Sequence, residues 1–178
     1  GRKPPRAPGR HGSWGTQRAW HDPYMKATAA VLREPTGEFQ IEQIEVAEPR
    51  SDEVLVRMVA TGVCHTDLLS RELPPELFVG PIVFGHEGAG VVEAVGADVT
   101  HVAPGDHVVL SFDSCGACPS CSAGRPYGCY HFNAYNLKNA GYPPGRLDGT
   151  SAFTSADGSP LGSHFFGQSS FASHSVVS

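Results

Sequence analysis

Short apolar runs separated by turn residues dominate the pattern along this chain. Strand-length runs rich in β-branched and aromatic residues cover 27–32, 39–46, 54–60, 91–95 and 107–110, and 165–177 has the same strand-like texture. The alternation in 39–46 is interrupted near Gln43. Only 64–72 looks helical, with Leu68 and Leu69 on one side and charged residues beside them. Strands at this spacing with one short helix predict a mainly β fold, a closed or partly closed barrel.

Glycine and proline content supports this prediction. The chain holds 21 Gly and 15 Pro among 178 residues, which favours turns over long helices. From about 116 to 162 Cys, Pro, Gly and Asn/Asp replace any periodic pattern. A loop of that length inside a compact domain needs a function or a staple. No apolar run is long enough to span a bilayer and no signal-peptide core is present, so we expect no membrane partner.

Charge is unevenly divided along the chain. Residues 1–24 carry five basic residues and one acidic residue, a balance of +4, and the rest carries 8 basic and 17 acidic residues, a balance of −9. We expect 1–24 to be a disordered basic leader without a function, because it has too little apolar surface to offset the entropy of ordering. The acidic body argues against a nucleic-acid partner, since phosphate binding needs a basic face.

Four of the five cysteines fall within fifteen residues, as Cys115-x2-Cys118-x2-Cys121-x7-Cys129. Such close neighbours are poor disulfide partners and good metal thiolates, which indicates a reducing, cytoplasmic compartment. Four thiolates suit a closed tetrahedral structural zinc. An iron–sulfur cluster is the rival, but bacterial ferredoxin spacing has a final gap of three with Pro after the last Cys. We therefore predict a zinc-stapled lobe over 113–131.

A second set of candidate ligands lies outside this lobe. Gly85-His86-Glu87 precedes a glycine-punctuated strand, and Cys64 opens Cys64-His65-Thr66-Asp67. Thiolate and imidazole are ligands of catalytic zinc, which keeps one position open. The nearby Gly88-Ala89-Gly90 resembles a dinucleotide fingerprint, but it precedes a strand and has Glu93 at the third glycine position. We do not interpret it as a nucleotide site.

Together these motifs resemble the zinc-dependent alcohol dehydrogenases of the medium-chain dehydrogenase/reductase superfamily. The resemblance covers about 25–178 and implies the GroES-like catalytic domain of that family, ending before its nucleotide-binding Rossmann domain. It implies NAD and zinc as cofactors, an alcohol or aldehyde as substrate, and a homo-oligomer at full length. We expect the isolated chain to be inactive, because a third zinc ligand and the cofactor fold would lie beyond its end.

The resemblance also implies roles for single residues. Cys64 and His86 would bind the catalytic zinc, and Glu87 is a less favoured additional ligand. Asp67 would accept a hydrogen bond from His86, although a helix cap or a surface carboxylate is an equal reading of the residues alone. Thr66 would bond the substrate oxygen and begin a proton relay.

Two positions depart from the family pattern. His65 stands where an arginine often contacts the cofactor pyrophosphate, so we expect the grip on the cofactor to weaken as pH rises. Leu69 replaces a histidine that often ends the proton relay. A leucine cannot accept a proton, so the relay would end elsewhere or in water.

The substrate is inferred from Phe112, Phe165 and Phe166. An aromatic lining suits flat aryl alcohols, and with Leu69 it resembles the aryl-alcohol (benzyl alcohol) dehydrogenase branch. Ordinary barrel core is an almost equal reading of these phenylalanines. Two alternatives to this function stay open: a dehydrogenase acting on a formaldehyde–thiol adduct, and a stand-alone zinc-stabilised β-barrel binding module without catalysis.

Overall fold

The computed structural model describes residues 24–137 and 145–178. The predicted leader 1–24 therefore lies outside the described residues except for Tyr24. None of the described helices is long and apolar enough to cross a membrane.

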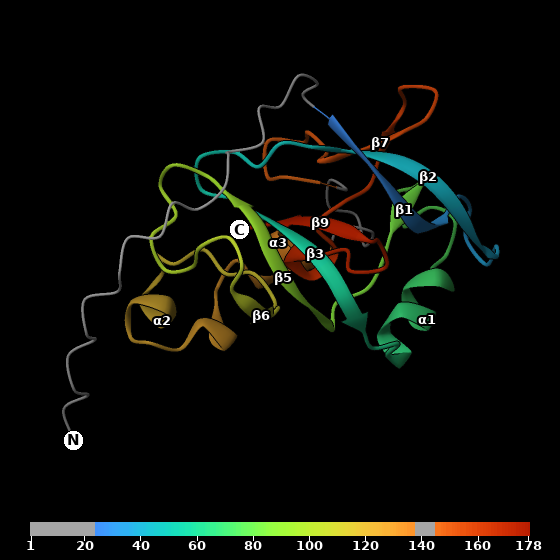
Figure 1. Cartoon of the computed structure of the whole chain (residues 1–178). Coiled ribbons are helices and arrows are strands. Elements are labelled where there is room, and N and C mark those ends of the chain that lie inside the picture. Colours follow the sequence, from blue (N-terminus) through green and yellow to red (C-terminus); the bar gives the residue numbers. More distant parts are fainter. Residues whose placement is uncertain (1–23, 138–144) are drawn as a thin grey trace.

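Two antiparallel sheets form the body of the molecule (Figure 1). One sheet has the strand order β4-β1-β2-β7-β8, and the other has the order β6-β5-β3-β9. The strands are β1 Tyr24–Leu32, β2 Phe39–Ala47, β3 Val54–Thr61, β4 Ile82–Val83, β5 Gly88–Val95, β6 His107–Val109, β7 Phe153–Ser155, β8 Pro160–Leu161 and β9 His174–Val177.

The segment before β9 joins the two sheets. Phe171 O accepts a hydrogen bond from Ala30 N of β1 at 2.8 Å, and Ser173 O accepts one from Met58 N of β3 at 2.9 Å. The two sheets are thereby closed on one side into a partial barrel, and the predicted mainly β, partly closed barrel is confirmed.

Strand alternation explains the main core between the sheets. The buried residues of the first two strands are Ala27, Ala29 and Val31 of β1 and Ile44 and Val46 of β2. Ile41 is 75% exposed, whereas Ile44 is fully buried. Because these two positions have opposite parity, the apolar pattern of β2 changes face between them, which accounts for the interruption near Gln43.

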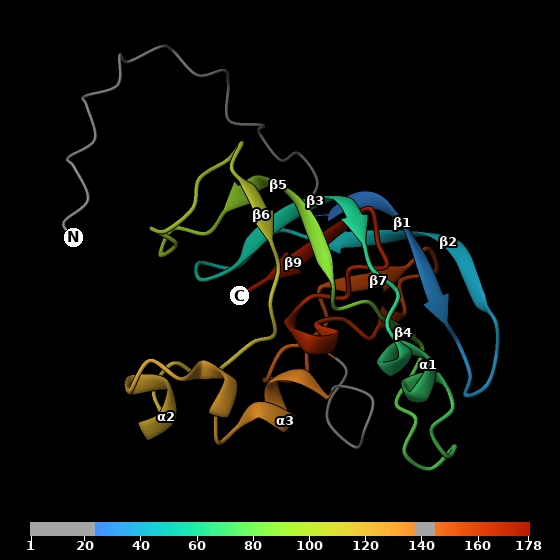
Figure 2. The same cartoon turned by 90° about the horizontal axis from the view of Figure 1, so that it is seen from below.

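The helices are short, and the sequence predicted only one of them. α1 spans His65–Arg71, close to the predicted 64–72, and α2 Pro119–Ser122, α3 Phe132–Asn136 and the 3-10 turns η1 Pro126–Gly128 and η2 Phe165–Gly167 were not expected. Figures 1 and 2 show α2 and α1 at opposite ends of the molecule, and in Figure 2 both lie below the strands.

The prediction of strand-like structure over 165–177 is wrong for its first part. Residues 165–167 form η2, and φ is positive at His164, Phe166 and Ser169. Only His174–Val177 forms a strand. Phenylalanine and valine favour strands, but tertiary hydrogen bonds and packing decide the conformation here.

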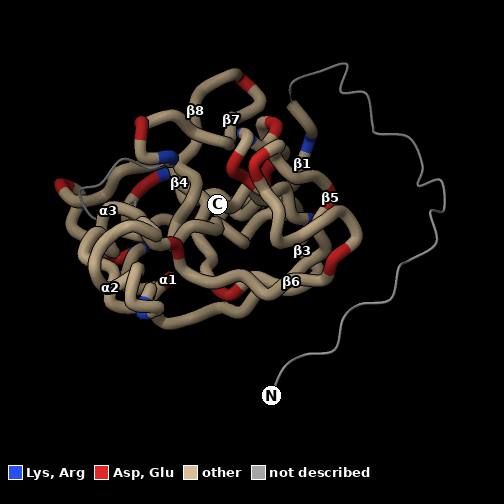
Figure 3. The backbone as a smooth tube through the Cα atoms, turned by 90° about the vertical axis from the view of Figure 1, so that its left-hand side faces the viewer, with Lys and Arg blue, Asp and Glu red and all other residues tan. Residues whose placement is uncertain are grey.

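A buried ion pair attaches the 145–152 loop to the start of β3. Glu53 accepts from Arg146 Nε at 2.5 Å and from Arg146 Nη2 at 2.7 Å. Burial would raise the pKa of Glu53, but hydrogen bonds from Arg146, His164 and the Arg50 N–H outweigh it and hold that pKa well below its usual range. Figure 3 shows acidic positions at many places along the described backbone, with a few basic positions among them.

Candidate metal centres

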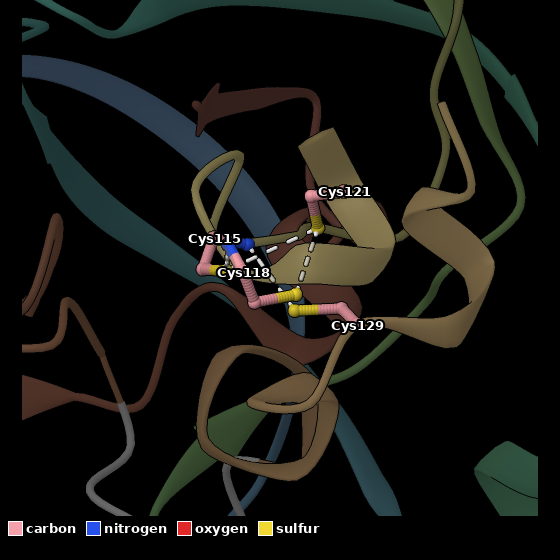
Figure 4. Close-up of side chains that lie close together, drawn as sticks. All are labelled: Cys115, Cys118, Cys121 and Cys129. Carbon is pink, nitrogen blue, oxygen red and sulfur yellow. Dashed lines mark hydrogen bonds between the residues drawn. The ribbon is translucent and has the colours of Figure 1, made fainter. Parts of the chain in front are cut away.

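The four clustered cysteines converge within one lobe (Figure 4). Cys118 Sγ lies 3.5 Å from Cys121 Sγ, and Cys115 Sγ lies 3.9 Å from Cys121 Sγ. All five cysteines of the chain are free. A tetrahedral zinc with Zn–S bonds of about 2.3 Å separates its sulfurs by about 3.8 Å, so these thiols fit a closed zinc site.

Local backbone structure sets this geometry. Cys118 is the N-cap of α2, with Pro119 in the first helical position, where its missing N–H costs nothing. Gly116 and Gly124 have positive φ, which glycine adopts without strain. The N–H of Cys118 points to Cys115 Sγ at 3.3 Å, and the N–H of Cys115 points to Cys129 Sγ at 3.4 Å. Backbone donors thus already face the sulfurs.

The thiols of the lobe differ in their tendency to ionise. Backbone hydrogen bonds from Cys121 and Tyr130 lower the pKa of Cys118 to about 6. Burial and the neighbouring Cys118 thiol raise the pKa of Cys121 to about 12. Adjacent thiolates would repel one another, and the positive charge of a bound divalent cation would offset that repulsion and favour deprotonation of all four sulfurs. The donor set therefore suits a bound metal better than four free thiols.

The second ligand set also comes together, from two separate loops. Cys64 is the N-cap of α1, and His86 and Glu87 lie in the connection from β4 to β5. One ligand atom from each of Cys64, His86 and Glu87 lies within 4.8 Å of the others. A thiolate, an imidazole and a carboxylate are all zinc ligand types, and three protein ligands leave one position of a tetrahedron free. This arrangement fits an open site.

Asp67 lies behind this cluster and is fully buried. Its carboxylate accepts from Cys64 N at 3.0 Å, from Gly85 N at 3.1 Å and from His86 Nδ1 at 3.1 Å. With Nδ1 bonded to Asp67, the Nε2 atom of His86 is the one available to a metal. Asp67 is thus the partner of His86, and it also closes the capping box of α1 from the third helical position, whereas the N-cap itself is Cys64.

Two glycines make room for the ligands. Gly85 has a φ of 93°, a left-handed conformation, and a Cβ there would come within 2.6 Å of Phe171 N. A Cβ at Gly62 would overlap the carboxylate of Glu87. Glycine at 85 therefore lets the loop approach the backbone at Phe171, and glycine at 62 leaves space for the Glu87 carboxylate.

Aromatic rings pack against the His86 ring, whose Nδ1 is bonded to Asp67. Phe166 lies tilted against its ring, with centroids 4.8 Å apart, and Phe165 meets it edge-on at 5.7 Å. Phe132 links Phe166, at 6.1 Å, to Phe112, at 5.5 Å. Phe165 is fully buried in a core cluster with Leu32, Ile82 and Phe84, whereas Phe166 is only partly buried.

Residues 50–158, more than half of the chain, match the family model described as the alcohol dehydrogenase GroES-like domain. The chain belongs to this family. A geraniol dehydrogenase from Castellaniella defragrans is 47% identical over 155 residues, and an S-(hydroxymethyl)glutathione dehydrogenase from Escherichia coli is 44% identical over 156 residues. These alignments cover 86% of the chain but only 39% and 40% of the two relatives.

Solved structures agree with this membership. An alcohol dehydrogenase zinc-binding domain protein from Burkholderia ambifaria matches with 48% identity and a TM-score of 0.80, over 86% of the chain and 40% of that structure. Benzyl alcohol dehydrogenase from Acinetobacter calcoaceticus matches with 38% identity and a TM-score of 0.75, over 86% and 39%. The chain thus spans about two-fifths of the length of the proteins that it resembles.

Within this GroES-like domain, the remaining predicted site residues have distinct settings. The Thr66 hydroxyl lies 3.6 Å from Cys64 Sγ. His65 is exposed at the first residue of α1, and Leu69 is 55% exposed. Phe112 lines a cavity of about 500 Å³ over the sheet that contains β5 and β6.

Sequence reasoning missed two residues that contact this region. Phe132 lies in an aperiodic stretch, where nothing set it apart from other loop residues. Gln168 is 1% exposed and bonds to the backbone beside Glu87. A polar residue between Phe165-Phe166 and Phe171 was the one available signal of a buried amide with specific partners.

Proposed function

We propose that this domain is the zinc-binding and substrate-binding part of a zinc-dependent alcohol dehydrogenase. The enzyme would oxidise a primary alcohol, in particular an aryl alcohol, to an aldehyde with NAD, as a cytoplasmic homo-oligomer. The observation that carries the proposal is the convergence of Cys64, His86 and Glu87, with Asp67 behind His86. The geraniol and benzyl alcohol dehydrogenases among the similar proteins support an alcohol of this kind.

In this proposal Cys64 and His86 would hold the catalytic zinc. Glu87 would be a third ligand, or one that leaves the metal when another ligand binds. Bound zinc supplies a Lewis acid beside which an alcohol loses its proton near neutral pH. Asp67 keeps the proton of His86 on Nδ1, which leaves Nε2 to bind the metal. The Thr66 hydroxyl, near Cys64 Sγ, would accept the alcohol proton at Oγ1 while it passes its own proton on to water.

The protein also shapes the surroundings of the site. Phe166 covers one face of the His86 ring and would exclude water from the reacting alcohol carbon. His65, at the exposed start of α1, would contact the cofactor. The four cysteines would hold a structural zinc whose role is to fold the lobe.

A chimera tests the proposal, because the chain matches only part of its relatives. The matching region of the Castellaniella defragrans geraniol dehydrogenase would be replaced by residues 25–178, and NAD reduction measured with benzyl alcohol, geraniol and ethanol. We expect turnover with benzyl alcohol and none in the matched Cys64→Ser chimera. Equal activity of both chimeras would contradict the proposal.

The same assay separates the alternatives. Because S-(hydroxymethyl)glutathione dehydrogenases are 43–44% identical to the chain, the glutathione adduct of formaldehyde belongs among the substrates. Preference for that adduct over benzyl alcohol would replace the aryl alcohol. A folded, zinc-loaded chimera without turnover on any of them would favour a binding module.

A further inference from the structure

A buried glutamine spans the peptide that carries the proposed ligands. Gln168 Nε2 donates to His86 O at 2.8 Å, and Gln168 Oε1 accepts from Gly88 N at 3.1 Å. His86 and Gly88 are the two neighbours of Glu87, so one side chain holds the backbone on both sides of that residue.

The amide chemistry of this contact is specific. A carbonyl needs a donor and an N–H needs an acceptor, and the side-chain amide of Asn or Gln carries both on one planar group. Gly88 is buried and shielded from solvent, so without this amide its N–H would lack a hydrogen-bond acceptor. The two partners also fix the orientation of the amide. In the reverse orientation the amide oxygen would face the His86 carbonyl oxygen and the amide NH2 would face the Gly88 N–H.

The backbone on either side of Gln168 is held under strain. φ is 60° at His164, 50° at Phe166 and 56° at Ser169, a left-handed conformation that is unfavourable for a non-glycine residue. Ser169 Oγ ties the turn to β4 by donating to Val83 O at 2.6 Å and accepting from Phe165 N at 3.0 Å. Strain of this kind persists only where surrounding contacts over-determine it.

This strained turn contacts the candidate site twice. Phe166 packs against the His86 ring, and Gln168 bonds to the His86 carbonyl. Asp67 approaches the same histidine from α1. His86 is therefore fixed at its ring nitrogen by α1, and at its ring face and its peptide by the strained turn.

We propose that Gln168 is a positioning residue, which sets the directions of the His86 and Glu87 side chains by clamping the peptide on both sides of Glu87. The inference rests on the proposed metal-binding role of Cys64, His86 and Glu87. It adds a residue that touches neither metal nor substrate and acts through the two residues that do.

The chain contains a matched control at the other centre. Asn136, also fully buried, accepts from Asp113 N at 2.8 Å and donates to Asp113 O at 2.9 Å, two residues before Cys115. Asn136 is thus an amide clamp of the same kind beside the four-cysteine lobe. If clamping is local, each amide affects only its own metal centre.

The test is cobalt(II) titration of the 178-residue chain, with absorption bands separating the four-thiolate site from the one-thiolate site. Gln168→Met removes both hydrogen bonds, and Gln168→Asn keeps the amide but shortens its reach. We expect about 10–100-fold weaker cobalt binding at the one-thiolate site and shifted d–d bands, as for other outer partners of metal ligands. The four-thiolate site should keep its affinity, and Asn136→Leu should show the reverse pattern.

The outcomes separate this inference from the proposed function. Unchanged affinity and bands at the one-thiolate site in folded Gln168→Met would overturn the positioning role while leaving the metal site intact. Unfolding of both Gln168 variants, or equal weakening of both sites, would assign Gln168 a merely structural role and also overturn it. If the wild type and Cys64→Ser bind cobalt identically, the proposed function itself fails.

Discussion

The two candidate metal centres differ in where their geometry comes from. The four cysteines lie within fifteen residues of one loop. The groups that contact their sulfurs are mainly backbone N–H groups of the same loop. Cys64 and the His86-Glu87 pair instead come from separate loops, which Asp67, Gln168 and Phe166 hold in place. We therefore expect the first site to need its metal to stay folded, whereas contacts from several segments hold the ligands of the second.

This difference fits the two proposed uses. A structural metal contributes folding free energy to a loop that has little core of its own. A catalytic metal needs a vacant position, and only rigid surroundings keep three ligands in place when the fourth position exchanges. The predictions below test this division in order of decreasing effect.

Removing the metal from the four-cysteine lobe should have the largest effect. Zinc binding contributes about 10–16 kcal/mol in zinc-finger peptides, so Cys118→Ser or chelation should unfold residues 115–129. Hydrogen exchange should show lost protection there and retained protection in β1, β2, β3 and β5. Retained protection in the metal-free lobe would mean that its shape does not need the metal.

Breaking the Glu53–Arg146 pair tests the barrel that supports the open site. Glu53→Gln leaves the buried Arg146 charge uncompensated, and we expect a loss of about 3–5 kcal/mol in the free energy of unfolding, measured with urea. The matched control is Asp148→Asn at the exposed Arg50–Asp148 pair, with a loss below about 1 kcal/mol. Equal losses would show that burial does not strengthen the Glu53 pair.

The same variant gives a pH prediction. Because the pKa of Glu53 is lowered on folding, its contribution is complete above its ordinary pKa of 4.5 and is lost as pH falls below that value. The wild type should lose stability below about pH 4.5 more steeply than Glu53→Gln. Parallel pH profiles would contradict the role assigned to this carboxylate.

Asp67→Asn addresses the open site alone. Three N–H donors converge on Asp67, and the amide has only one oxygen to offer them. We expect about 10–100-fold weaker metal binding at Cys64 and His86, with the four-thiolate site unchanged. An equal loss of metal affinity at both sites would contradict the assignment of Asp67 to the open site alone.

The smallest expected effect concerns the ring beside His86. Phe166→Leu keeps an apolar side chain but removes the ring contact at 4.8 Å, which should cost about 0.5–1.5 kcal/mol of stability. In Phe112→Leu, where the ring contacts Phe132 instead, metal affinity at the open site should not change. A larger loss of metal affinity in Phe112→Leu than in Phe166→Leu would show that Phe112, and not Phe166, is the ring that supports His86.

Local features were the most predictable from the sequence. The strands over 27–32, 39–46 and 54–60 follow from β-formers between turn residues, and the cysteine spacing states the ligand set of the lobe by itself. The helix near Cys64 was also predicted. Each of these signals lies within a few consecutive residues.

Features that depend on distant contacts were not predictable. The left-handed turn around Phe166 is imposed by bonds to β4 and β9 against the strand preference of its residues. The clamp by Gln168 joins positions 80 residues apart. Glu87 was the less favoured ligand, because nothing local shows that Gly62 leaves space for its carboxylate beside Cys64.

Zinc content measures the central claim most directly. The account predicts two zinc ions per folded wild-type chain, one ion in Cys64→Ser, and one in Cys118→Ser that is lost on further replacement of His86 by Ala. A single zinc ion in both the wild type and Cys64→Ser would contradict the open site and the dehydrogenase chemistry proposed from it.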